Sequence, residues 1–354
     1  MATVTTRRDQ PDNPEAYDER LGRVGLGRRL LARPELGAAV GAVAVFAFFA
    51  GYTDQFATAR GIGNMLDPAA TLGIMAVVVA LLMIGGEFDL SAGVMTASSG
   101  LVIAMLTTEA GLNVWPAILL ALVFGALVGL ANGLLVVRTG LPSFIVTLGT
   151  FLVLQGLNLG VTKVVTETVQ VGGVHRTEGY DSAFAVFART FSVGDGDYRI
   201  TILWWLGVTA LATWVLLRTR AGNWVFSVGG NPAAARSVGV PVARTKVLLF
   251  VTVSVTAALV GAMLVLRLRS VQANQGIGDE FQFIIAAVIG GCLLTGGYGS
   301  AVGAAIGALI FGMAKQGIVF AGWDSDWFQL FLGVLLLLAA MLNHYVRRRA
   351  EARR

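Results

Sequence analysis

Two acidic residues, Glu87 and Asp89, lie in the segment GGEFDLSAG at 85–93, directly between two apolar runs. An acidic group at membrane depth costs about 2.5–3.5 kcal/mol on insertion scales and is tolerated mainly where it is buried in protein or reaches water. Asp89 with Ser91 is suited to cap a helix that starts near Leu90, and the glycine pair frees the backbone before it. We therefore expect a discontinuous helix packed inside protein or lining a cavity, with an ordinary tight loop as the alternative.

A polar, basic segment at 221–246 lies between two other apolar runs and encodes both ends of a short helix. Asn231 is suited to cap the helix, Pro232 to its first position and Gly239 to its end. Because a two-turn helix is marginal alone in water, we expect it to dock against a partner protein. The residues of this predicted docking element are Gly229, Gly230, Asn231, Pro232, Ala233, Ala234, Ala235, Arg236 and Gly239.

The residues that carry most enzyme and metal chemistry are scarce in this sequence. Cys292 is the single cysteine, which excludes a disulfide framework within the chain and a cysteine-based metal site. With two histidines, His175 and His344, a histidine-cluster metal site is not expected either. The phosphate-binding GK[ST] motif is absent, and we find no constellation of nucleophile, base and metal ligands. We therefore expect neither an enzyme nor a cofactor bound by this chain.

The composition indicates a membrane protein. Hydrophobic residues make up 56% of the 354, charged residues only 13%, and the mean hydropathy is +0.74. About a quarter of a soluble chain is charged. The 45 glycines suit close packing between transmembrane helices. The net charge of +5 is explained by basic residues flanking membrane spans, so nucleic acid is not an expected partner.

Apolar runs of the length needed to cross a bilayer recur along the chain and predict an all-α polytopic membrane protein with about ten transmembrane helices. Two of these spans, 90–107 and 281–297, are short or broken. The predicted spans are 36–53, 62–84, 90–107, 113–137, 141–161, 200–217, 247–266, 281–297, 300–321 and 327–346.

The basic residues predict the orientation. With the N-terminus inside, 18 lysines and arginines fall in inner segments and seven in outer loops, as the positive-inside rule expects. We therefore place both termini in the cytoplasm and expect a multi-pass protein of the plasma membrane. A disordered tail at 1–34 precedes a transmembrane domain at 35–346, and a basic tail follows at 347–354. The domain has an external loop at 162–199 and a cytoplasmic coupling loop at 218–246.

The external loop contains YDSAFAVFARTF, in which Ala183, Phe184, Val186, Phe187 and Phe191 recur at roughly helical spacing. We expect a short helix lying on the outer membrane face. It either packs on the rest of the chain or forms a docking surface for an external protein.

A second glycine-rich break, GGCLLTGGYG at 290–299, occurs in the second half of the chain. Two glycine-interrupted segments in corresponding halves are typical of internally repeated transporters, so we expect a pseudo-repeated core.

Five separated stretches together resemble the permease subunit of bacterial ATP-binding-cassette importers for monosaccharides, the group that includes ribose, xylose, arabinose and autoinducer-2 systems. They cover most of residues 62–346 in the family's order, and Glu87 and Phe88 depart from the family's usual GGIDLSVG. The stretches are GGEFDLSAG at 85–93, LPSFIVTLGT at 141–150, VGGNPAAARSVGV at 228–240, GIGDEFQFIIAAVIGGCLLTGG at 276–297 and LFLGVLLLLAAMLN at 330–343.

The resemblance implies that Gly229 to Gly239 is the coupling element that sits in a groove of an ATPase subunit. ATP and magnesium would then bind to that separate subunit, which is expected to be a fused double cassette. The family's permeases pair as homodimers or heterodimers and receive the sugar from an extracellular or periplasmic binding protein.

A sugar path needs polar groups and aromatic faces that release the solute readily. Interhelical hydrogen bonding, worth about 0.6 kcal/mol per pair, is the alternative role for the same residues. Glu280, beside Asp279, is suited to receive sugar hydroxyls or to contact a binding protein. The alternative is that both residues are solvated loop charges. The candidate path residues are Glu87, Asp89, Asn132, Phe144, Thr147, Thr150, Phe151, Gln155, Asn158 and Glu280.

Two other functions remain open on the sequence. The first is the same kind of permease carrying nucleosides or branched-chain amino acids. The second is an ion-coupled secondary transporter working alone, for which Glu87, Asp89 and Lys315 are the available buried ionisable residues.

Overall fold

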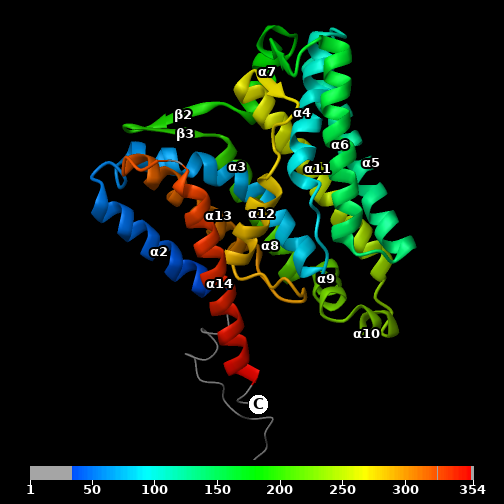
Figure 1. Cartoon of the computed structure of the whole chain (residues 1–354), viewed down its shortest axis with the longest axis vertical. Coiled ribbons are helices and arrows are strands. Elements are labelled where there is room, and N and C mark those ends of the chain that lie inside the picture. The colour runs from blue at the N-terminus through cyan, green and yellow to red at the C-terminus, as the bar shows by residue number, and fades with distance from the viewer. Residues whose placement is uncertain (1–33, 325, 352–354) are drawn as a thin grey trace, which may run out of the picture. The chain divides into compact units, whose positions relative to one another are not determined.

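The computed structural model describes residues 34–324 and 326–351 and is built almost entirely of helices (Figure 1). The expected tail at 1–34 lies outside the described residues except for Pro34. The first part of the chain forms α2 (Pro34–Tyr52), α3 (Ala59–Ile84), α4 (Ala92–Thr108), α5 (Val114–Thr139), α6 (Ser143–Thr166), β1 (Gln170–Gly172), η2 (Val174–Arg176) and α7 (Tyr180–Phe187). The rest forms β2 (Thr190–Val193), β3 (Gly196–Arg199), α8 (Thr201–Arg218), α9 (Arg220–Gly230), α10 (Pro232–Ser237), α11 (Val242–Leu268), β4 (Ser270–Gln272), α12 (Asp279–Ile289), α13 (Ala301–Phe320) and α14 (Trp327–Glu351).

Each of the ten expected spans falls on a helix, which confirms the all-α polytopic fold. Among the described residues, seven helices are long and apolar enough to cross a membrane: α2, α3, α5, α6, α8, α11 and α13. The two spans expected to be short or broken are α4, with 17 residues, and α12, with 11. In α14 the apolar part is Trp327–Ala339, and the helix continues to Glu351, through most of the expected basic tail at 347–354.

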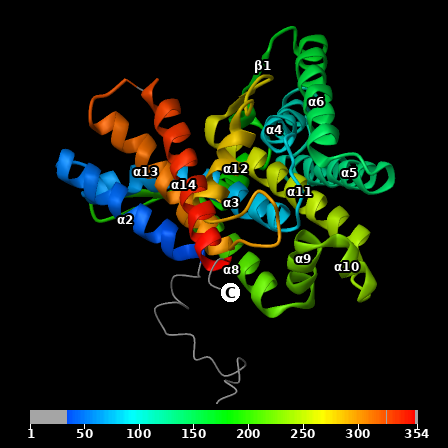
Figure 2. The ribbon, with the colours of Figure 1, turned by 60° about the horizontal axis from the view of Figure 1, so that its bottom comes forward.

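Helix α3 lies at the centre of the bundle, where α8, α11, α12 and α13 surround it (Figure 2). Every residue from Leu72 to Ile84 is buried. A second extensive contact joins α11 to α5 and α4, and a third joins α13 to α2. Glycines permit these close approaches: Gly125, Gly129 and Gly133 recur at every fourth position of α5 and face the backbone of α11.

The outer helices keep large apolar side chains exposed. Leu127 on α5, Leu152 on α6 and Leu206 on α8 are 59%, 58% and 56% exposed. An apolar surface of this extent is costly in water and is stable against lipid tails or a partner helix. The exposure therefore agrees with a bundle immersed in a bilayer.

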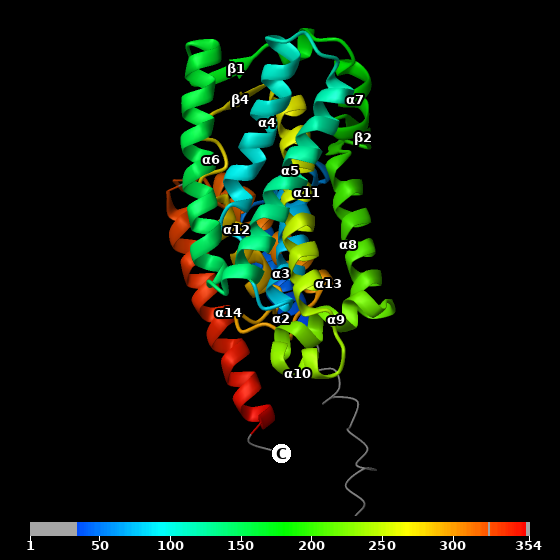
Figure 3. The ribbon, with the colours of Figure 1, turned by 90° about the vertical axis from the view of Figure 1, so that its right-hand side faces the viewer.

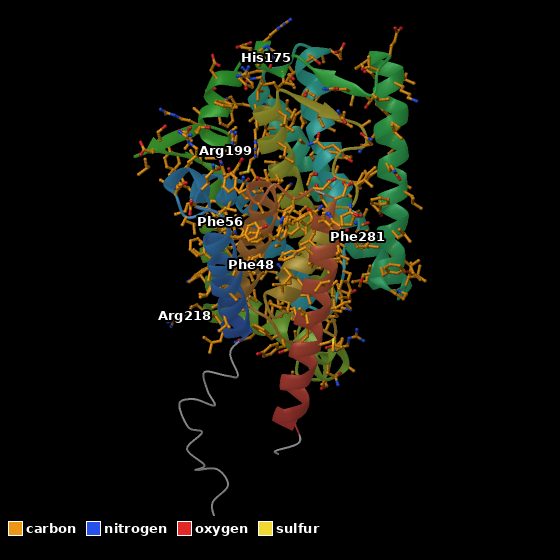
Figure 4. All side chains as sticks on the ribbon, turned by 60° about the vertical axis from the view of Figure 1, so that its left-hand side comes forward. Phe48, Phe56, His175, Arg199, Arg218 and Phe281 are labelled. Atoms are coloured by element: carbon orange, nitrogen blue, oxygen red, sulfur yellow. The ribbon has the colours of Figure 1, made fainter. Side chains whose placement is uncertain are left out.

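The two ends of the bundle differ (Figure 3). One end, called here the sheet end, carries α7 and two small antiparallel sheets, β1 with β4 and β2 with β3. The opposite end, called here the α10 end, carries α9 and α10. Figure 4 shows the same division, with His175 at the sheet end and Arg218 toward the other.

Candidate functional site

The short helix α10 has the ends that its sequence predicts. The Asn231 side-chain oxygen accepts hydrogen bonds from the backbone N–H groups of Ala233 and Ala234, each at 3.0 Å. Pro232 occupies the first position. The helix stops at Ser237, and Gly239 follows with a φ of +84°, a left-handed conformation that favours glycine.

Helix α10 is held to the rest of the chain by a small contact. Its buried residue is Ala235, 3% exposed, which packs with Val228 of α9 and Val242 of α11. Just after the helix, Val238 is 78% exposed, and Arg236 is exposed as well. A capped helix with an exposed apolar side chain and an exposed cation is a suitable surface for a partner protein.

Helix α9 precedes α10 directly and was not expected, because 218–246 was interpreted as a loop around a single short helix. The Thr219 side chain caps α9 by accepting the N–H of Gly222 at 3.2 Å. The Thr219 cap and the spacing of the buried residues Val225 and Val228 are sequence signals that predict such a helix.

The last residues of α9 meet the end of α3 backbone to backbone. A β-carbon on Gly229 would overlap the carbonyl oxygen of Ile84 and lie 2.7 Å from the backbone nitrogen of Gly297. The Gly297 N–H donates a 2.8 Å hydrogen bond to the same Ile84 carbonyl. We call this contact of Ile84, Gly86, Gly229, Gly296 and Gly297 the glycine junction. It places the residues before α10 against both glycine-rich breaks.

The two breaks end their helices in the same way. Gly85 has φ −69° and ψ −2° and Gly86 has φ +82°; Gly290 has φ −67° and ψ −1° and Gly291 has φ +92°. In both, the second glycine and the residue after it donate backbone hydrogen bonds back into the last turn, at 2.9–3.1 Å. The same ending closes α13, where Ala321 has φ −71° and Gly322 has φ +68°, so it is a common helix ending and the repeated core stays a prediction.

Side chains from other helices hold the first break. The Phe88 N–H donates to the Ser143 hydroxyl and the Leu90 N–H to the Thr147 hydroxyl, each at 3.0 Å. The Glu87 carboxylate forms an ion pair with Lys246 of α11. The segment is buried inside protein, as the discontinuous-helix interpretation requires, although α4 begins at Ala92, two residues later than expected.

Several predicted path residues form one chain of hydrogen bonds. The Ser91 hydroxyl donates to Asp89 at 2.5 Å, the Asn132 amide donates to Ser91 at 3.1 Å, and Thr150 donates to the Asn132 oxygen at 2.6 Å. Asp89 is 1% exposed, and its second carboxylate oxygen has no hydrogen-bond partner among the described residues. This series of hydrogen bonds links the first break to α5 and α6, which is the arrangement expected if these residues bond between helices.

The beginnings of α4 and α12 lie against each other. Gly93 in the first turn of α4 packs on the Gly276 backbone and on the Glu280 carboxylate in the first turn of α12. Glu280 is 4% exposed and accepts the N–H of Gly278 at 3.1 Å. A carboxylate at a helix N-terminus is stabilised by the helix dipole, which explains how Glu280 is tolerated in the interior rather than in a solvated loop.

The other predicted path residues do not join this cluster. Phe144 is 52% exposed on α6, and Phe151 and Gln155 are partly buried there. Asn158 is 7% exposed, and its side-chain nitrogen has no hydrogen-bond partner among the described residues. The predicted path residues therefore fall into two sets, a buried polar cluster at the first break and a row of residues along α6.

Sequence reasoning missed an ion cluster near the sheet end. Arg267 of α11 makes two hydrogen bonds to the Asp67 carboxylate of α3, at 3.0 and 2.7 Å, and Arg199 of β3 approaches the same carboxylate at 3.2 Å. The bidentate pair joins two long helices, and Arg199 adds the β2–β3 hairpin. Arg267 was counted only as a loop charge.

The helix expected in the external loop is α7. It includes Ala183, Phe184, Val186 and Phe187, whereas Phe191 lies in β2. Tyr180, Ala183 and Phe187 are buried, and the Tyr180 hydroxyl donates to the Leu266 carbonyl at 2.9 Å. One face of α7 therefore packs on the bundle.

Comparison with known proteins connects this geometry to a transport family. Residues 61–340 match the family described as the permease component of branched-chain amino acid transport systems. The ribose import permease protein RbsC of Escherichia coli strain K12 is 32% identical over 291 residues, covering 82% of this chain and 87% of that protein. RbsC of Bacillus subtilis is 33% identical, with coverage of 79% and 83%.

The fructose import permease protein FrcC of Rhizobium meliloti is 30% identical, covering 83% of this chain and 80% of that protein. No solved structure matches. The match over most of the chain, together with relatives above 30% identity across four fifths of it, shows that this protein belongs to the family of ABC importer permeases.

Proposed function

We propose that this chain forms the translocation path of an ATP-driven importer for a monosaccharide, with ATP hydrolysed on a separate subunit. The observation that carries the proposal is the continuous connection from the exposed helix α10 through Gly229 to the end of α3 and to Gly297 in the second glycine-rich break. A partner that moves α10 displaces backbone that touches both breaks, because no side chain intervenes at the glycine junction. The relatives named for ribose, fructose and galactose support a sugar as cargo.

The complex we infer contains a second permease subunit, identical or related, an ATPase that grips α10, and a sugar-binding protein at the sheet end. ATP and magnesium bind the ATPase. The exposed apolar surfaces of α5 and α6 are available for lipid and for the second permease.

The test disrupts α10 in the assembled transporter. Arg236→Glu combined with Gly239→Pro reverses the exposed charge and places proline where φ is +84°. We expect uptake and ATPase co-purification to be lost while membrane insertion remains normal. Arg220→Glu, an exposed arginine at the start of α9, is the control and leaves both unchanged. Normal uptake and association in the double variant would show that the coupling role is wrong.

We infer that the α10 end faces the cytoplasm, since the 218–246 segment carries five of the basic residues. Cysteine labelling tests this in a Cys292→Ser background. Ser237→Cys, exposed at the end of α10, reacts with a membrane-impermeant maleimide only after the cells are opened, and Asp195→Cys, in the β2–β3 hairpin, reacts in intact cells. The reverse pattern refutes the orientation.

A solitary ion-coupled transporter is less well supported. Glu87, one of the acids such a mechanism would use, is paired with Lys246. Transport by the purified chain driven by a proton or sodium gradient alone would favour that alternative.

A further inference from the structure

A pocket at the sheet end is lined almost wholly by uncharged polar side chains. It lies where β1, which follows α6, meets β4, which follows α11. Its lining residues are Gln170, Leu268, Ser270, Gln272, Asn274 and Gln275. None of the sequence signals pointed to it, because glutamine and asparagine in a short loop are ordinary surface residues.

The strand pairing makes these side chains converge. Val171 and Val271 are register partners, each 3% exposed, and they face the core. Because successive residues of a strand point to opposite faces, the partners Gln170 and Gln272 point outward together. The turn after β4 brings Gln275 back to the same pocket, and the Gln275 N–H donates to the Gln272 carbonyl at 3.1 Å.

The chemistry of the lining selects for neutral, hydroxyl-rich solutes. Each amide side chain offers an acceptor oxygen and two N–H donors, which match hydroxyl groups that both donate and accept. Leu268 adds one apolar surface for the C–H face of a ring. Neither Arg267, which is bound to Asp67, nor Arg269 lines the pocket. The lining therefore supplies no charged side chain to pair with the ammonium or carboxylate of an amino acid or with a phosphate.

The chain segment that lines the pocket continues to the contact between α4 and α12. Its last lining residue, Gln275, is followed by Gly276, whose backbone packs on Gly93 at the beginning of α4. Glu280, four residues further on, lies at the same contact. One short segment therefore runs from the open pocket to the place where α4 and α12 begin.

We propose that this amide-lined pocket is the subsite that first receives a neutral polyhydroxylated solute from the binding protein. The inference rests on the proposed import function and specifies the cargo class, favouring sugars over amino acids. Weak binding through exposed amides suits a site that must release its ligand inward.

The test uses the full transporter in proteoliposomes with its ATPase and binding protein. Gln170→Leu combined with Gln272→Leu removes two amides while keeping side-chain bulk. We expect monosaccharide uptake per ATP hydrolysed to fall about five- to tenfold, the loss of one or two solute hydrogen bonds. Binding-protein affinity and the melting temperature in detergent stay unchanged. Gln55→Leu, exposed in the loop between α2 and α3 and outside the pocket, is the matched control and behaves as wild type.

Two results overturn the inference while the import function stands. If the double variant weakens binding-protein affinity, the pocket is a protein-docking surface. If wild-type and double-variant uptake agree, the amides do not contact the solute. If the wild-type complex moves no monosaccharide at all, the proposed function itself fails and this inference fails with it.

Discussion

The glycine pairs that end α3 and α12 share a backbone conformation but not their surroundings. After Gly86 the chain carries Glu87 and Asp89, whereas after Gly291 it carries Cys292 and two leucines. Hydroxyls of Ser143 and Thr147 and the amine of Lys246 hold the first break to α6 and α11. The second break is joined to the first through the backbone bond from Gly297 to Ile84.

The difference teaches how one local motif can serve two roles. The helix ending depends on the second glycine of each pair, because Gly86 and Gly291 have the positive φ that favours glycine, whereas Gly85 and Gly290 are right-handed. What each break is attached to depends on the side chains that follow. Polar groups bind the first break to α5, α6 and α11. The second break contacts the first through the backbone at the glycine junction.

The largest effect is expected at the junction itself. Alanine at Gly229 would overlap the Ile84 carbonyl and separate α9 from both breaks, costing roughly 3 kcal/mol. We expect uptake to be abolished and the melting temperature to fall. Gly230→Ala, one residue later, has open space around the new methyl group and is the control. Equal behaviour of the two variants would show that the junction does not transmit motion.

The ion pair at the first break comes next. Lys246→Met leaves Glu87, whose side chain is 8% exposed, without its cation, and breaking such a pair costs about 3 kcal/mol. Adding Glu87→Gln removes the unpaired charge and is expected to restore most of the loss, as measured by thermal unfolding in detergent. Arg220→Met is the control for loss of an exposed charge. A double variant less stable than Lys246→Met would contradict this account.

The hydroxyl contacts are expected to matter less. Thr147→Val keeps the shape of the side chain but leaves the buried Leu90 N–H without its acceptor, at a cost of about 1–2 kcal/mol. Thr213→Val on α8 removes a hydroxyl that bonds only within its own helix and is expected to cost less. The comparison of their unfolding temperatures shows whether α6 anchors the first break.

The smallest effect is expected at the α10 cap. Asn231→Ala removes two hydrogen bonds to the first turn and destabilises the helix by about 1 kcal/mol. ATPase association is then expected to weaken about fivefold, measured by titration of the purified subunit. Asn223→Ala, exposed on α9, is the control. An unchanged affinity would mean that the partner orders α10 regardless of the cap.

Much of the fold could be predicted from the sequence, because its signals are local. Asn231, Pro232 and Gly239 encode the ends of α10 within nine residues, and long apolar runs encode the spans. The candidate site was predicted less completely. Asn132, Thr147 and Thr150 were chosen by residue type, but their bonding to the first break depends on helix packing. The pairing of Lys246 with Glu87 depends on helix packing in the same way, whereas α9 has local signals in the Thr219 cap and the spacing of Val225 and Val228.

The sequence by itself determined the membrane class, the positions of the apolar runs, the capped helix and the two glycine breaks, since hydropathy and backbone preference act over short distances. Only the tertiary structure decided that Gly229 touches Ile84 and Gly297, and that Gln170 faces Gln272. These contacts join residues more than 65 positions apart, and glycine and glutamine carry no local signal of a distant partner. Their meeting depends on how the helices pack, which is a property of the whole bundle.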